Sequence, residues 1–182
     1  MIIKDKTELQ KKCEPCSSIE EGEEIGAKLL NELNKSEVSG IGLAANQIGI
    51  NKRVCVVNVK EPIVLINPKI VEKSKEKFVF LEGCLSFPNN SIKTVRYKSV
   101  TVEADNYEGK LHFGVWNENN EEGYNKHEKL DYALETVCVQ HEIDHLDGIT
   151  MYDRRVIITP AKSNKIGRNE KVTITKGSES KV

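Results

Sequence analysis

The sequence predicts an α+β domain in which short, mainly antiparallel strands form small sheets packed around a central helix that carries an HExxH motif. Three observations support this fold class. An amphipathic pattern indicates an early helix, several strand-like apolar runs follow it, and a second helical pattern carries the two histidines of the motif. A chain of 182 residues with 38% hydrophobic residues suits one domain with an ordinary core.

The early helix is predicted from the spacing of its apolar residues. In EEGEEIGAKLLNELN (20–34), Ile25, Leu29, Leu30 and Leu33 recur three or four residues apart, which places them on one face of a helix. We expect this face to pack against the domain and to take no part in chemistry.

The segment GIGLAANQIGI (40–50) is predicted to be a glycine-rich turn. It lacks the GxGxxG order and the Walker lysine of nucleotide-binding loops. Gly40 and Gly42 instead allow another extended backbone to approach closely, and we expect them to place the amide of Gln47 near the HExxH motif.

Strands are predicted where apolar residues run together or alternate. The runs are KRVCVVNV (52–59), PIVLINPKIV (62–71), KFVFL (77–81), IKTVRY (92–97) and SVTVEADNY (99–107). After Gly109, the sequence up to Leu130 predicts a hairpin with a polar tip, on which we interpret His112, Trp116 and His127 as surface residues.

The late helix is predicted to begin near Asp131, whose side chain would cap it, and to stop at Gly148. Five residues form one stripe along this helix. They are Leu134, Val137, Cys138, His141 and His145.

The stretch QHEIDHLDG (140–148) predicts a metal site on this helix. Residues four apart lie on one helical face, so the rings of His141 and His145 converge on one ion. Glu142 points to the flank, where it reaches an activated water and acts as general base rather than as a ligand. The alternative is a pair of unrelated surface histidines. Two imidazoles hold a catalytic metal poorly, so a third ligand is needed.

The third ligand is not found after the motif. A metzincin would continue with a histidine at position 151, where this chain has Met151. No histidine follows His145, and the only later glutamates, Glu170 and Glu179, lie in a polar tail without a helical pattern. The ligand therefore comes from upstream.

Among the cysteines, Cys84 fits best as the third ligand. Cys138 lies on the same helical stripe, but its side chain is too short to reach an ion between the two rings. Cys55 lies in an apolar run typical of a core strand, and the Cys13/Cys16 pair has no second CxxC to complete a structural zinc site. Cys84 in FLEGCLSFP follows a strand-like run, whose rim can face a neighbouring helix.

Three motifs together resemble the peptide deformylase family. They are GIGLAANQ (40–47), EGCLS (82–86) and QHEIDHLDG (140–148), in this order, and the resemblance runs from about residue 30 to about residue 155. It implies removal of the formyl group from N-formylmethionine of nascent polypeptides, with one divalent metal ion per chain. The family typically uses Fe²⁺, with Zn²⁺, Ni²⁺ or Co²⁺ as substitutes, and the sequence alone does not decide between them.

The resemblance also assigns roles to residues of this sequence. Cys84, His141 and His145 would be the metal ligands and Glu142 the catalytic acid and base. Gln47 and the backbone N–H of Leu85 would bind the oxyanion, at a cost of about 3 to 4 kcal/mol for losing one such donor. The substrate would be bound in an apolar groove that takes methionine. Its expected residues are Ile41, Gly42, Phe80, Leu134, Val137 and Cys138.

The remaining expectations concern the tail and the partners. We expect one catalytic domain over 1–162 and a polar tail over 163–182, either a short strand at KVTIT or disordered. Many bacterial members end in a long helix, which this tail does not predict, so ribosome docking would lack that helix. Net charge −1 gives no case for nucleic acid or membrane, and five cysteines without a disulfide spacing suit the cytoplasm.

Two rival functions remain open from the sequence. The first is a zinc endopeptidase, which the missing downstream ligand argues against. The second is a non-catalytic module stabilised by metal, in which Glu142 is only a surface carboxylate.

Overall fold

The computed structural model describes residues 1–35, 40–114, 126–159 and 173–176. Its helical elements are α1 (Lys6–Leu9), α2 (Ile19–Lys35), η1 (Ala45–Ile48), α3 (Lys126–Leu146) and η3 (Met151–Arg154). Its strands are β1 (Gly42–Ala44), β2 (Val54–Val57), β3 (Ile63–Ile66), β4 (Lys69–Lys73), β5 (Lys77–Glu82), β6 (Ile92–Tyr97), β7 (Ser99–Glu103), β8 (Leu111–Gly114), β9 (Val156–Thr159) and β10 (Thr173–Lys176).

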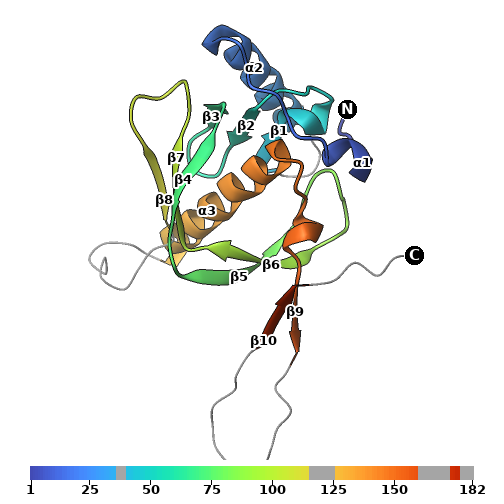
Figure 1. The fold of residues 1–182 in the computed structure, drawn as a ribbon, viewed down its shortest axis with the longest axis vertical. Helices are drawn as coiled ribbons and strands as arrows, with labels where there is room; N and C mark the ends of the chain where they lie inside the picture. Colours follow the sequence, from blue (N-terminus) through green and yellow to red (C-terminus); the bar gives the residue numbers. More distant parts are fainter. Residues whose placement is uncertain (36–39, 115–125, 160–172, 177–182) are drawn as a thin grey trace, which may run out of the picture.

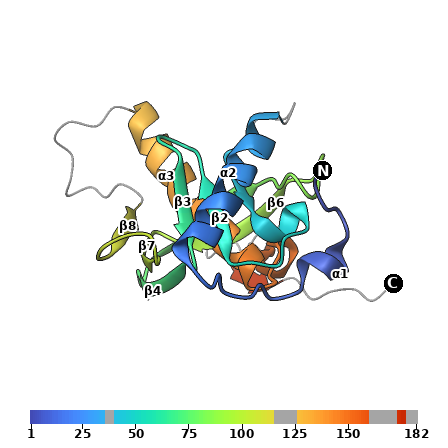
Figure 2. The ribbon, with the colours of Figure 1, turned by 90° about the horizontal axis from the view of Figure 1, so that it is seen from above.

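The described strands form small antiparallel sheets, which confirms the predicted α+β class. Two sheets have three strands, in the orders β1-β2-β3 and β4-β7-β8, and two are pairs, β5-β6 and β9-β10. Helix α3 runs through the middle of this arrangement (Figure 1). Seen from above, the β4-β7-β8 sheet and α1 lie on opposite sides of the molecule (Figure 2).

Strand β2 joins two hydrophobic clusters because both of its faces are buried. Cys55 and Val57 pack with α3 residues such as Ile143, whereas Val54 and Val56 pack against α2. All four side chains of the strand are fully buried. This double burial explains why the run VCVV is continuously apolar instead of alternating with polar residues.

Helix α2 matches its prediction closely. The predicted apolar face, Ile25, Leu29 and Leu33, is buried on the sheet of β1 to β3, with Leu30 packed at its edge. Burial of three such side chains contributes roughly 1.5 to 3 kcal/mol each. The helix thereby holds the sheet that presents β1 to α3.

Helix α3 begins earlier than the sequence predicted. It already starts at Lys126, five residues before the expected cap at Asp131, because Lys, Glu and Leu in this stretch favour helix and no Gly or Pro interrupts it. Its end agrees better with the prediction. The helix ends at Leu146, and Gly148 has φ of +72°, a conformation that favours glycine.

Two other predictions change in detail. The segment expected to be only a glycine-rich turn contains strand β1 followed by the 3₁₀ helix η1, because Gly42 to Ala44 pair with β2. In the expected hairpin after Gly109, β8 pairs with β7, and exposed His112 lies on β8. The polar tip with Trp116, and the side chain of His127, lie outside the described residues.

The C-terminal tail contains a strand. Residues Thr173–Lys176 pair with β9, which follows η3, so this part of KVTIT takes the strand alternative. The β9-β10 pair projects away from the body of the molecule (Figure 1). None of the described helices is long and apolar enough to cross a membrane.

Candidate metal centre and active site

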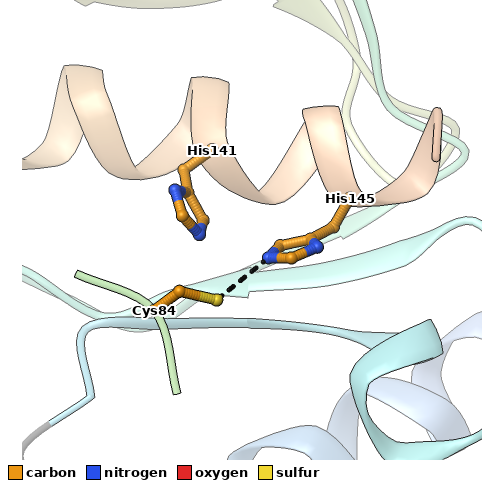
Figure 3. A group of neighbouring side chains, drawn as sticks. All are labelled: Cys84, His141 and His145. Atoms are coloured by element: carbon orange, nitrogen blue, oxygen red, sulfur yellow. Dashed lines mark hydrogen bonds between the residues drawn. The ribbon is translucent and has the colours of Figure 1, made fainter. Parts of the chain in front are cut away.

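Helix α3 places the two histidines of the motif side by side. Their ring centroids lie 4.9 Å apart, and both side chains are buried. In Figure 3 both rings project from successive turns of α3 toward Cys84 on the facing segment. The spacing of four residues therefore has the geometric result expected from the sequence.

Cys84 meets the histidines from the end of β5. Its Sγ lies 3.3 Å from Nε2 of His145, and one ligand atom from each of the three residues lies within 4.8 Å of the others. Gly83 separates Cys84 from the last residue of β5, and the following turn is closed by a hydrogen bond from the N–H of Phe87 to the carbonyl of Cys84. The sulfur is thereby directed toward α3 (Figure 3).

The three residues fit a divalent metal ion. One thiolate and two imidazole nitrogens are a donor set that suits zinc or iron. Nδ1 of His141 is engaged by Glu82 Oε2 at 2.8 Å, which leaves its Nε2 for a ligand. No described residue partners the buried Nδ1 of His145. Cys138, which lies on α3, is outside this group, and its thiol faces the carbonyl of Ile41 at 3.1 Å.

Behind His141 lies a buried chain of charges that the sequence reasoning missed. Glu82 accepts hydrogen bonds from Arg96 at 2.5 and 2.8 Å, and Arg96 also pairs with Asp144 at 2.5 Å. Arg154 pairs with the same aspartate at 2.6 Å. A carboxylate on the second nitrogen of a ligating histidine fixes the orientation of the ring. Two sequence features could have indicated this chain of charges: Glu82 within the motif EGCLS, and Arg96 in the strand run IKTVRY.

The same contacts set the ionisation of the chain. Burial alone would raise the pKa of Glu82, but hydrogen bonds from Arg96 and His141 outweigh it and hold that pKa well below its usual range. Burial alone would lower the pKa of Arg96, but its hydrogen bonds to Glu82 and the charges of Glu82 and Asp144 outweigh burial and raise that pKa. Glu82 and Arg96 are therefore ionised, and each neutralises the other in the interior.

Glu142 lies beside the ligands without joining them. Its side chain is buried, and Oε2 has no hydrogen-bond partner among the described residues. Burial, helped by the charge of Glu82, raises the pKa of Glu142 to about 7. A carboxyl group with a pKa near neutrality exchanges protons readily at that pH, as a general acid and base must.

Strand β1 closes the site opposite α3. A Cβ built on Gly42 would lie 2.5 Å from both Oε1 of Glu142 and Sγ of Cys138, so only glycine allows this approach. Gln47 follows on η1, where its Oε1 accepts from the N–H of Ala44 at 2.8 Å. Its Nε2 points to Cys84 Sγ at 3.5 Å and to Ser86 Oγ at 3.1 Å.

A cavity of about 720 Å³ lies beside these residues. Leu85, whose N–H was predicted to bind an oxyanion, also lines it directly after Cys84. Predicted residues in the lining are Ile41, Gly42, Gln47, Phe80, Leu134, Val137, Cys138, His141 and Glu142. Sequence reasoning missed Ile2, Leu81 and Phe87, because no local pattern reveals that the N-terminal segment and the turn after Cys84 reach the same cavity.

Comparisons with known proteins agree on one family. The family model described as polypeptide deformylase matches residues 1–164. A peptide deformylase of Desulforudis audaxviator is 39% identical over 145 residues, 77% of this chain and 81% of that protein. The peptide deformylase of Rhizobium meliloti is 40% identical over 123 residues, which cover 64% of this chain and 62% of the relative's length.

Solved structures extend the likeness to the whole fold. The crystal structure of peptide deformylase from Thermotoga maritima superposes with a TM-score of 0.69 and 29% identity, covering 85% of this chain and 96% of that one. A probable peptide deformylase from Synechococcus phage S-SSM7 gives a TM-score of 0.66 at 34% identity, covering 85% and 98%.

Proposed function

Because the chain belongs to the polypeptide deformylase family, we propose that it removes the N-terminal formyl group of nascent polypeptides through a metal site made by Cys84, His141 and His145. The reaction is hydrolysis of the N-formyl amide of N-formylmethionine, and formate leaves. One observation carries the proposal. The three ligand atoms lie within 4.8 Å of one another, and two of their residues, Cys84 and His141, line an apolar cavity. Glu142 lines the same cavity, and its buried Oε2 has no hydrogen-bond partner among the described residues.

A divalent metal ion bound there would act as a Lewis acid on the formyl carbonyl and lower the pKa of water. We expect Fe²⁺, with Zn²⁺, Ni²⁺ or Co²⁺ as substitutes. The thiolate of Cys84 and the nitrogens of His141 and His145 would hold it, and Glu82 would fix the ring of His141.

Glu142 moves the protons of the reaction. It takes a proton from the attacking water as the water oxygen bonds to the formyl carbon, and it then gives that proton to the amine nitrogen as the C–N bond breaks. Burial raises the pKa of this carboxyl group, which helps it to hold the proton between the two transfers. The C–N cleavage yields formic acid and the free amine of the N-terminal methionine. The acid then releases its remaining proton to become formate, and the amine takes up a proton at neutral pH, so atoms and charge balance without another reactant.

Negative charge develops on the formyl oxygen during this attack. Nε2 of Gln47, which in this structure donates to Ser86 Oγ and Cys84 Sγ, is the first proposed donor to this oxygen, and the backbone N–H of Leu85 is the second. Donors placed in advance cost no reorganisation during the reaction, and each contributes about 3 to 4 kcal/mol. The apolar residues Phe80, Leu134 and Val137 would receive the methionine side chain beside the site, while Ile41 and Gly42 would run along the substrate backbone.

We propose a cytoplasmic enzyme, since all five cysteines are free thiols. The described part of the tail, Thr173–Lys176, is a strand, so this part offers no helix for docking on the ribosome.

The test is anaerobic assay of formate release from a formyl-Met peptide, with and without a chelator. We expect release that stops with chelator and returns when Fe²⁺ is added. Cleavage of internal peptide bonds without formate release would indicate an endopeptidase instead. Metal-dependent stability without any hydrolysis would indicate a non-catalytic module, and either result would overturn the proposal.

A further inference from the structure

Asn46 has a set of contacts that the site described above does not use. It lies on η1 directly before Gln47 and is only 8% exposed. Its Nδ2 donates to the carbonyl of His145 at 2.7 Å and to the carbonyl of Leu9 at 3.4 Å. Because both neighbours are acceptors, only the NH₂ side of the amide can face them, and this fixes the orientation of the side chain.

The carbonyl of His145 belongs to the last turn of α3, where carbonyl groups lack helical partners. The N–H of Gly148 approaches it at 3.1 Å, and Asn46 supplies a second donor from outside the helix. The backbone of a metal-ligand candidate is therefore held directly by the 3₁₀ helix η1.

The same short helix carries the amide proposed to bind the oxyanion. Gln47 is fixed on its other side by the N–H of Ala44 and by Ser86. These bonds align it with β1 and with the segment after Cys84, but none of them reaches α3. Among the described residues, Asn46 is the side chain of η1 that hydrogen-bonds to α3.

Asn46 also anchors the N-terminal segment to the same place. Leu9, the second acceptor, is the buried end of α1, and the N–H of Cys13 donates to the carbonyl of Leu146 at 2.9 Å. The N-terminal segment and η1 therefore meet at the C-terminal turn of α3. The buried Oδ1 of Asn46 makes no hydrogen bond to a described residue. The side-chain amide therefore makes its contacts through Nδ2 and leaves its acceptor unsatisfied, which is uncommon for a buried polar atom.

We infer that Asn46 is a positioning residue, which sets the distance between the Gln47 amide and the metal-ligand turn of α3 by bonding to the carbonyl of His145. This inference rests on the proposed function, because it concerns the alignment of the oxyanion donor. Small misplacements of groups that act in the transition state reduce turnover strongly while leaving substrate binding nearly unchanged.

The test compares Asn46→Ala and Asn46→Asp with Asn106→Ala. Asn106 makes a similar pair of bonds, accepting from Ile66 at 3.0 Å and donating to Val64 at 2.9 Å, away from the cavity. We expect kcat for a formyl-Met peptide to fall about tenfold in Asn46→Ala, with KM within about twofold of wild type. Asn106→Ala should keep the kcat of wild type, even if its Tm falls as much as that of Asn46→Ala. Asn46→Asp should be at least as impaired, since it places an oxygen against two carbonyls.

Hydrogen exchange of the metal-free proteins gives a readout that does not depend on activity. The amides of residues 45–50 should exchange about tenfold faster in Asn46→Ala than in wild type, and not in Asn106→Ala. The inference is overturned if wild type releases formate and both alanine variants have the kcat and the exchange rates of wild type. Absence of formate release by the wild type would overturn the proposed function instead, so the two failures are distinguishable.

Discussion

The cavity beside α3 and the β9-β10 pair are built in opposite ways. Residues far apart in the sequence converge on the cavity: Gln47 from η1, Cys84 from the end of β5 and Glu142 from α3. Among the described residues, the sheet of β9 and β10 has only these two strands. It is linked to β6 by one isolated bridge, between Thr94 and Arg155, the residue before β9. Side chains held from several directions keep a fixed geometry, which chemistry needs, whereas a two-stranded pair is marginal by itself. Substitutions in the cavity should therefore change activity far more than changes in the pair.

The largest effect should come from Glu142→Ala. We expect turnover to fall on the order of 10³-fold while metal content stays unchanged, because Glu142 moves protons and does not ligate. Glu135→Ala is the matched control, since Glu135 is also buried on α3 but pairs with Lys60 at 2.6 Å. Steady-state kinetics and metal analysis of both proteins check this. Loss of metal from Glu142→Ala would make Glu142 a ligand and end its role as general base.

A smaller effect is expected at Glu82, which contacts the ligand candidate His141. Glu82→Gln should weaken metal affinity about 10- to 100-fold, because the carboxylate that orients His141 becomes a neutral amide. Competition with a chelator measures it. Glu72→Gln, at an exposed pair with Lys110, should leave the affinity unchanged. Equal affinities of the two variants would show that the buried chain stabilises the fold without acting on the site.

The smallest effect should follow removal of the tail. Truncation after Lys162 should leave turnover of a short formyl-Met peptide within about threefold, equivalent to less than about 1 kcal/mol. The truncation removes β10, whose partner in the described structure is β9, so the cavity keeps its walls. Turnover and Tm of the full and shortened chains test it. A large drop in both turnover and Tm would show that the β9-β10 pair is needed for the fold, and that the pair and the cavity do not differ as described.

Much of the fold followed from local patterns. The apolar face of α2 and the strands were predicted from the spacing of apolar residues along the sequence. In the structure these apolar residues of α2 and β2 are buried, as their spacing indicates. The approach of Cys84 to the two histidines followed from spacing and from the chemistry of metal ligands. Those features depend on residue type and short separation, which a sequence displays directly.

The features that were missed depend on how distant segments meet. Glu82, Arg96 and Asp144 come from β5, β6 and α3, and each looks like an ordinary surface charge until the three elements pack together. Asn46 lies in the motif GIGLAANQ (40–47), yet its contacts with α3 form only when η1 packs against the end of that helix. The start of α3 at Lys126 was missed because a capping residue was given more weight than the helix-favouring residues before it.

The most direct test of the metal site is the metal content of two purified cysteine variants, prepared anaerobically. Cys138 lies on α3 and Cys84 faces it, but of these two cysteines only Cys84 has its sulfur beside the ligand nitrogens of His141 and His145. Cys84→Ser should lose most of its bound metal, and Cys138→Ser should keep it. Loss of metal from Cys138→Ser together with retention by Cys84→Ser would contradict the assignment of the site.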